Sequence, residues 1–366
     1  MKSISIYRIA AILIVVTLTA IVLYYGKTFL IPLFFSILFA MLLVPVCRKL
    51  EKWGISRVWS TLMGILIIIL FVLAILGIIG AQAASLSQDL PKIQAKAQQL
   101  IQHMQGWVQS QFGVTPQQQI SYLQKGVGNI SNSANSFFTS VLSGAMGLIT
   151  GFVLFLLYFF FLMWKREKYK EFILRLVEEE NRNEASKTVD QITHVASQYL
   201  VGRLVSMVFL ALCYMIGFSV VGLPNGFLVA LVAVIPTIVP YVGAFVGGFF
   251  PLAIALVSGS SGMILPVAII LVAAQAIDNN IIEPLVEGES LDISPVFTIV
   301  AIVLGEMVWG VAGMVLFIPL FAILKIVCDH IPALHPYSFL LNNEVQEPQW
   351  VENIKNSVKR LKSKKE

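Results

Sequence analysis

Long apolar stretches that carry almost no charge are the feature that most constrains how this chain can fold. About eight of them follow one another, and a helix needs about 20 such residues to cross the hydrocarbon core of a bilayer. Lipid offers no hydrogen-bond partner to the backbone, so spanning segments of this kind are helical. Charged residues make up only 12% of the 366 residues, about half the share found in a soluble domain. We therefore predict an all-α polytopic membrane protein that is not an enzyme.

Clusters of basic residues indicate which loops lie in the cytoplasm. The first four apolar segments cover about residues 4–25, 29–47, 58–80 and 138–164. Lys and Arg gather after the second segment, from Arg48 to Arg57, and after the fourth, from Lys165 to Arg175. Because cytoplasmic loops are enriched in basic residues, we expect these clusters and both termini to be cytoplasmic.

Composition divides the chain into six expected regions. Only Gly26, Lys27 and Thr28 separate the first two segments, which predicts a tight hairpin. Apolar residues recur at spacings of three and four from Leu86 to Val108, within a Gln-rich stretch, as in an amphipathic helix. The expected regions are 1–80 with three spans, 81–137 as an extracytoplasmic Gln-rich amphipathic helical segment, 138–164 as the fourth span, 165–203 as a charged cytoplasmic helical segment, 204–328 as the transport core and 329–366 as a basic cytoplasmic tail.

Two apolar segments in the C-terminal half are too long for one straight spanning helix. They cover about residues 227–257 and 294–325, and Gly and Pro interrupt both. We predict broken helices or re-entrant hairpins, which are tolerated where protein or water surrounds the irregular backbone. If both segments cross once, the acidic stretch 278–292 lies outside, and if both re-enter, it lies inside. The residues expected at breaks and hairpins are Pro236, Pro240, Gly243, Gly247, Pro251, Pro284, Gly288, Pro295, Gly305, Gly310, Gly313 and Pro319.

Acidic residues of the same half are candidates for a transport site. No Lys or Arg occurs between Arg203 and Lys325, and we expect Arg203 itself to reach the membrane interface. An unpaired carboxylate at membrane depth costs about 3 kcal/mol or more, so it needs water, a proton or a cation. Carboxylate and amide oxygens are hard ligands that suit Na⁺ or H⁺ rather than soft metals. The candidate transport or cation-site residues are Asp278, Asn279, Asn280, Glu283 and Glu306.

A proline sets the expected end of the helix that carries most of these residues. Pro284 disfavours helix at the residue before it, so we expect the segment from Gly262 to end near Glu283. Glu287, Glu289 and Asp292 then belong to a solvated acidic loop.

The sequence lacks the motifs of several other functions. Gly26-Lys27-Thr28 is like the end of a phosphate-binding loop, but Ile21 stands where that loop needs glycine. The four histidines and three cysteines show no metal-ligand spacing, and no nucleophile motif of a hydrolase is present. No basic patch is interleaved with aromatic residues as in a nucleic-acid interface. We expect no cofactor, bound metal, ATP or nucleic acid, and as partners a small solute, H⁺ or Na⁺, membrane lipid and further copies of the chain.

Short motifs follow one another in order through the second half of the chain. They are Tyr199-Leu200-x-Gly202-Arg203, Gly222-Leu223-Pro224, Val239-Pro240-Tyr241-Val242-Gly243, Gly247, Pro251, Asp278-Asn279, Pro284, Gly288, Ser294-Pro295, Gly305, Gly310, Gly313 and Pro319. This ordered series resembles the autoinducer-2 exporter family, also called PerM-like permeases. The resemblance covers nearly the whole chain and implies a homo-oligomeric transporter of the bacterial inner membrane without an ATP-binding domain. It also implies export of a quorum-sensing furanone, as in some members, or Na⁺(Li⁺)/H⁺ antiport, as in others. Glu306 stands where the family has a small or apolar residue.

The residues and the resemblance together favour a secondary transporter. The leading hypothesis is export of a small, autoinducer-2-like solute driven by a proton or cation gradient. One alternative is a Na⁺(Li⁺)/H⁺ antiporter without an organic substrate. A second alternative is an oligomeric channel or scaffold.

Overall fold

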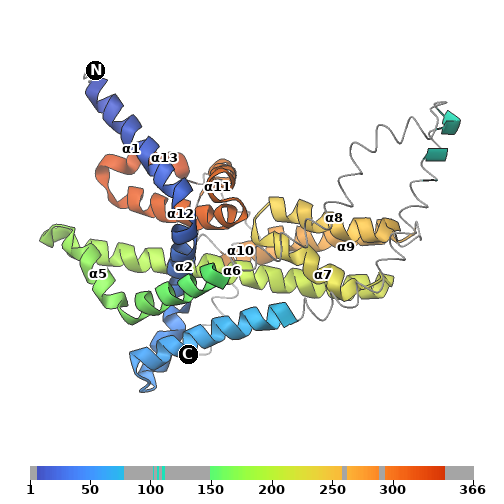
Figure 1. Cartoon of the computed structure of the whole chain (residues 1–366), viewed down its shortest axis with the longest axis horizontal. Coiled ribbons are helices and arrows are strands. Elements are labelled where there is room, and N and C mark those ends of the chain that lie inside the picture. Colours follow the sequence, from blue (N-terminus) through green and yellow to red (C-terminus); the bar gives the residue numbers. More distant parts are fainter. Residues whose placement is uncertain are drawn as a thin grey trace. The chain divides into compact units, whose positions relative to one another are not determined.

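The computed structural model describes residues 6–77, 102, 105–106, 109–111, 149–257, 262–287 and 293–342. Their regular elements are helices (Figure 1). Ile293 and Asn342 form an isolated antiparallel bridge. Five of the described helices are long and apolar enough to cross a membrane. The bent pair Ile149–Trp164 and Arg166–Arg175 would be a sixth such segment if the two helices form one span. The predicted all-α polytopic class is therefore confirmed. Most of the Gln-rich stretch expected to form an amphipathic helix, and Gly288, lie outside the described residues.

The chain divides into two compact units. The first comprises residues 1–70, 151–208 and 277–366, and the second comprises residues 71–150 and 209–276. The helix α6 (Arg182–Val221) is 40 residues long and passes from the first unit into the second without a break. The boundary expected between residues 203 and 204 thus falls inside one continuous helix.

The first unit begins with α1 (Ile6–Tyr25) and α2 (Lys27–Lys52), which do not form the expected hairpin. Helical hydrogen bonds cross the junction: Gly26 N–H donates to Val22 O and Leu30 N–H donates to Gly26 O, both at 2.8 Å. The φ of Gly26 is −79°, which is close to helical, so the chain continues onward instead of reversing (Figure 1). The hairpin prediction was wrong because a short polar link need not be a turn.

Buried hydroxyl groups tie α2 to its neighbours in the first unit. Ser60, in the helix Arg57–Gly77, donates to Cys47 O at 2.9 Å. Ser36 donates to Phe155 O, in the helix Ile149–Trp164, at 2.8 Å. That helix is followed by α5 (Arg166–Arg175), and the two are bent by 70°.

A helical hairpin completes the first unit. It consists of α11 (Pro295–Trp309) and α12 (Val311–His330), which meet at Gly310 with a φ of +61° that favours glycine. The backbones of Gly305 and Gly313 touch, because a Cβ on either would collide with the other residue's carbonyl. The short helices η4 (Pro332–Leu334) and α13 (His335–Leu341) follow. Pro295 lies in the first turn of α11, and α12 continues through Pro319.

The second unit contains the other interrupted apolar segment. Its helices are α7 (Gly226–Val234), η2 (Ile235–Ile238), α8 (Val242–Val257) and α9 (Ile264–Ile277). The chain turns at Pro240 and Tyr241, the latter with a φ of +61°. Gly243 and Gly247 then lie against the carbonyls of Pro236 and Ala233, which leaves no room for a Cβ. Both interrupted segments are therefore helix–break–helix hairpins held by glycine contacts, and α8 continues through Pro251.

Candidate functional site

The buried face of α6 carries two polar residues among large apolar and aromatic ones. Buried side chains recur on this helix at spacings of three and four, as expected for one helical face. They are Tyr199, Arg203, Ser206, Leu210, Tyr214 and Phe218. Arg203 and Ser206 both belong to the first unit, and each needs a polar partner because unpaired polar groups are costly to bury.

Those partners come from the segment after α9. Ser206 Oγ lies 2.6 Å from both carboxylate oxygens of Asp278. Arg203 Nη1 donates to Glu283 Oε1 at 3.1 Å. The fold therefore brings together two helices whose pairing residues are 72 and 80 positions apart in the sequence.

A π-helical turn, η3 (Asp278–Ile282), explains how both acids face α6. Residues five apart point in different directions on an α-helix but lie on one face of a π-helix, which bonds from residue i to i+5. Glu283 N–H donates to Asp278 O across this wide turn. Asp278 and Glu283 therefore share a face and meet Ser206 and Arg203, which are three apart on α6.

The same turn corrects the prediction that the helix stops before Pro284. The structure continues through it into α10 (Glu283–Glu287). In an α-helix a proline ring collides with the carbonyl four residues earlier. The wide turn moves this carbonyl away from its α-helical place, so Glu283 stays helical with a φ of −57° and a ψ of −52°.

Asp278 is the most deeply buried acid of the site, with 1% of its surface exposed. A serine hydroxyl carries one proton, so it can give one full hydrogen bond to an anionic carboxylate. Ser206 donates towards both oxygens, so its one proton is shared between them. The hydroxyl alone therefore leaves a buried carboxylate poorly satisfied, and a proton or a cation on Asp278 would complete its contacts.

The charges of the site do not balance. Arg203 supplies one positive charge, whereas Asp278 and Glu283 supply two negative charges when ionised. Arg203 is paired to Glu283, with side-chain exposures of 10% and 30%. One negative charge therefore remains in excess at Asp278, and a proton or a monovalent cation would neutralise it.

The remaining sequence candidates lie elsewhere or face outward. Asn279 and Asn280 follow Asp278 on the π-helical turn, but both side chains are exposed. Glu306 is exposed near the end of α11, and within the described part of the chain its side chain makes no hydrogen bond or ion pair with Asp278 or Glu283. Glu289 and Asp292, expected in a solvated acidic loop, lie outside the described residues.

Sequence reasoning missed Arg203 and Ser206 as members of the site. Arg203 was expected at the membrane interface, but it is 8% exposed and pairs with Glu283. The signal that could have found both is their position on the apolar stripe of α6, where a polar residue implies a buried partner. The partner itself could not be read from the sequence, because a π-helical turn breaks the expected helical spacing.

Comparisons with known proteins relate the chain to membrane transporters. The sequence profile described as "AI-2E family transporter" matches residues 12–333. YueF of Bacillus subtilis strain 168, provisionally named a transport protein, is 28% identical over 81% of this chain and 84% of its own length. The Escherichia coli K12 protein named AI-2 transport protein TqsA is 21% identical over 83% of this chain and 87% of its own length. PerM of the same organism, provisionally named a permease, is 25% identical over 87% of this chain and 91% of its own length.

Proposed function

Because the chain belongs to the AI-2E family of transporters, we propose that it is a secondary transporter in which Asp278 binds the coupling proton or cation. The observation that carries this proposal is the buried Asp278 on a π-helical turn, with both oxygens at the Ser206 hydroxyl. Ionisable groups inside membrane helices are expensive, and they mark ion pathways and proton relays. π-helical turns are also frequent at functional sites.

The site has two carboxylates and one guanidinium group, so it can exist in two states, with and without a proton or cation bound at Asp278. With a proton or cation on Asp278, the site is neutral overall and stable away from water. Without it, Asp278 and Glu283 compete for Arg203, and the ionised site favours a conformation that admits water. A ligand that binds one state better shifts the balance between them, which is the requirement for alternating access.

The proposed cargo is a small solute that leaves the cytoplasm. Support comes from the relative TqsA, which is named for transport of AI-2. We place the protein in the bacterial inner membrane with cytoplasmic termini, on the basis of its basic loops. Exchange of Na⁺ or Li⁺ for H⁺ without an organic solute is the second candidate, because the same buried carboxylate could serve either ion.

The test uses purified protein in sealed proteoliposomes with a pH-sensitive dye inside. A Na⁺ or Li⁺ gradient is imposed in one arm, and in the other a proton gradient drives a labelled autoinducer-2 furanone. We expect flux in at least one arm, lost in Asp278→Asn and retained in Glu171→Gln. Glu171 is a matched control because it is an exposed carboxylate on α5 whose ion-pair partner among the described residues is Arg175, four residues on. Flux that survives Asp278→Asn, or no flux in either arm, contradicts the proposal.

A further inference from the structure

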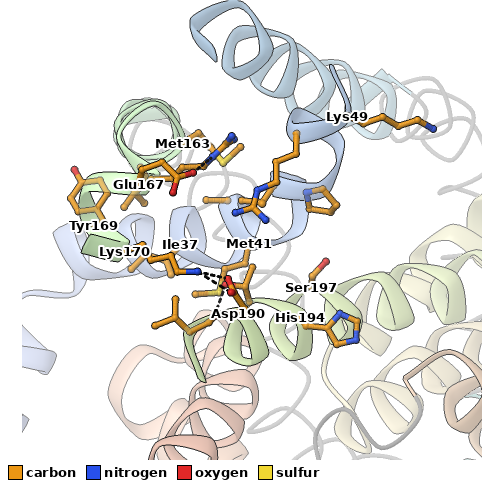
Figure 2. A pocket seen from close by; sticks show the side chains of 18 of the residues that line it. Ile37, Met41, Lys49, Met163, Glu167, Tyr169, Lys170, Asp190, His194 and Ser197 are labelled. Carbon is orange, nitrogen blue, oxygen red and sulfur yellow. Dashed lines mark hydrogen bonds and ion pairs between the residues drawn. The ribbon is translucent and has the colours of Figure 1, made fainter. Parts of the chain in front are cut away.

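A second polar region of the first unit, which does not include Asp278, lines an open cavity of about 1050 Å³. Its walls come from α2, from the helix Ile149–Trp164, from α5 and from the N-terminal half of α6 (Figure 2). This volume is at the upper end of the range for sites that hold small molecules.

One face of α2 changes character along the cavity wall. Its lining residues follow helical spacing and are first apolar, then basic. The apolar part contains Ile37, Ala40, Met41, Val44 and Pro45, and the basic part contains Arg48, Lys49 and Lys52. Leu162, Met163 and Ile173 extend the apolar wall from the neighbouring helices. The cavity therefore offers an apolar surface at one end and cations at the other.

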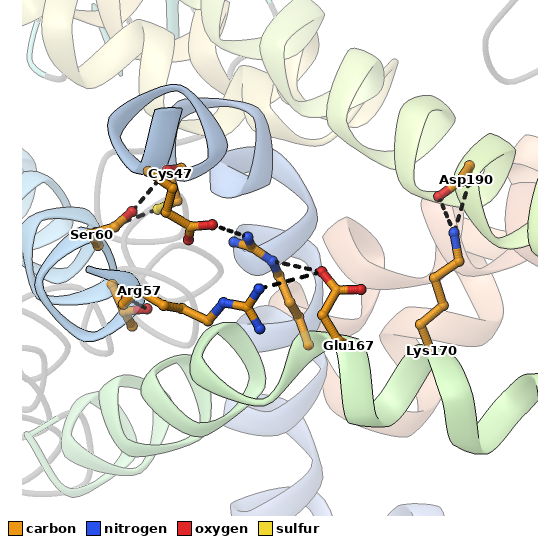
Figure 3. Close-up of polar contacts among 9 residues, drawn as sticks. Cys47, Arg57, Ser60, Glu167, Lys170 and Asp190 are labelled. Carbon is orange, nitrogen blue, oxygen red and sulfur yellow. Dashed lines mark hydrogen bonds and ion pairs between the residues drawn. The ribbon is translucent and has the colours of Figure 1, made fainter. Parts of the chain in front are cut away.

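Ion pairs neutralise some of the cations of this region, among them Lys170 and Arg166 (Figure 3). Lys170 contacts both oxygens of Asp190, at 2.8 and 2.9 Å. Arg166 pairs with Glu51 and Glu167, yet its Nη1 is buried and donates no hydrogen bond among the described residues.

Cations outnumber carboxylates around the cavity. Arg48, Lys49, Lys52, Arg166 and Lys170 line it, against Glu167, Asp190 and the Glu51 that pairs with Arg166. Arg57 pairs with Glu167 in turn, so the lining residues and their ion-pair partners together carry six positive charges against three negative ones, an excess of three. Arg48 and Lys52 form no ion pair within the part of the chain that the structure describes, and Lys49 lies over the ring of Trp53.

We propose that this cavity binds an anionic phospholipid of the cytoplasmic leaflet. The phosphodiester lies against Arg48, Lys52 and Arg166, and the acyl chains follow the apolar face of α2. Basic pockets between membrane helices on the cytoplasmic side bind anionic headgroups, and the guanidinium group matches the geometry of phosphate oxygens. A small soluble anion would use the cations but not the apolar wall.

Lipid-dependent stability of the purified full-length protein tests this proposal. The protein in a neutral detergent is titrated with phosphatidylglycerol, phosphatidylcholine or inorganic phosphate, and the unfolding midpoint is followed. We expect phosphatidylglycerol to raise the midpoint saturably and the other two to have little effect. Removing two cations in Arg48→Gln/Lys52→Gln should weaken the apparent affinity about thirtyfold, from about 1 kcal/mol for each cation near an anionic headgroup.

The control removes the same charge outside the cavity. Lys168 and Lys187 are exposed and do not line it, so Lys168→Gln/Lys187→Gln should bind phosphatidylglycerol like the wild type. The charge-preserving Arg48→Lys should keep most of the affinity for phosphatidylglycerol. It distinguishes a loss of positive charge from a disturbed fold as the cause of weaker binding in Arg48→Gln/Lys52→Gln. Equal weakening in both double variants means attraction by overall charge and overturns the proposal. An equal response to inorganic phosphate also overturns it, because the cavity would then bind free phosphate.

Discussion

The helix α6 carries two polar clusters whose charge imbalances have opposite signs. Towards its N-terminus, Asp190 belongs to a cavity with cations in excess, and further along, Arg203 and Ser206 belong to a site with one carboxylate in excess. The first cluster is half-exposed, and under our proposal an anion from the membrane surface neutralises it. The second is buried, and under our proposal a proton or a small cation neutralises it. The comparison teaches that the sign of the excess charge separates anion from cation binding, and that burial restricts the second cluster to a small ion.

Removing the guanidinium from the buried cluster should give the largest effect. Arg203→Gln leaves Glu283 and Asp278 without their positive partner, and breaking a largely buried pair should destabilise the protein by about 2 kcal/mol. Thermal unfolding in detergent measures the loss. The double variant Arg203→Gln/Glu283→Gln removes both charges and should recover most of it. If Arg203→Gln and Arg203→Gln/Glu283→Gln are equally stable, the unpaired Glu283 carboxylate is not the cause of the lost stability, which contradicts this prediction.

The Ser206 hydroxyl should have a smaller but clear effect. Ser206→Ala removes the group that contacts both oxygens of Asp278 and should cost about 1 kcal/mol of stability and a severalfold loss of flux. Ser219→Ala is the matched control on the same helix, because that hydroxyl bonds to Met215 O in an exposed position. If the two variants behave alike, the contact of Ser206 with Asp278 has no special role.

The ion pair between Lys170 and Asp190, at the cavity, should contribute least to the stability of the protein. Lys170→Gln breaks the contact with Asp190, whose side chain is 57% exposed, and should change stability by no more than about 0.5 kcal/mol. The unfolding midpoint in detergent, compared with that of Arg203→Gln, measures the difference between the two clusters. If Lys170→Gln lowers the stability as much as Arg203→Gln does, burial does not determine how much the two ion pairs contribute, which contradicts the comparison.

Much of the fold could be predicted, because it depends on local rules. The breaks at Pro240 and Gly310 follow from residues that interrupt helices, and the apolar segments follow from the cost of leaving backbone groups unpaired in lipid. The continuous path through Gly26 could not be predicted, since a glycine in a short polar link permits either a turn or a helix.

The candidate site was only half visible in the sequence. Asp278 and Glu283 stood out because no base lies near them in the sequence. Their partners stayed hidden, because Arg203 and Ser206 are about 70 to 80 positions away and become neighbours only through helix packing. The π-helical turn was hidden as well, because it is a local widening that no residue type in the segment demands.

The protonation state of Asp278 tests the central claim most directly. Infrared difference spectroscopy of the purified protein, started at low pH in cation-free buffer, detects the carbonyl stretch of a protonated carboxyl group. We predict a band that disappears on raising the pH or adding Na⁺ or Li⁺, that is missing in Asp278→Asn and that remains in Glu171→Gln. The same band change in Asp278→Asn as in the wild type would contradict the account, and so would the absence of any such change in the wild type.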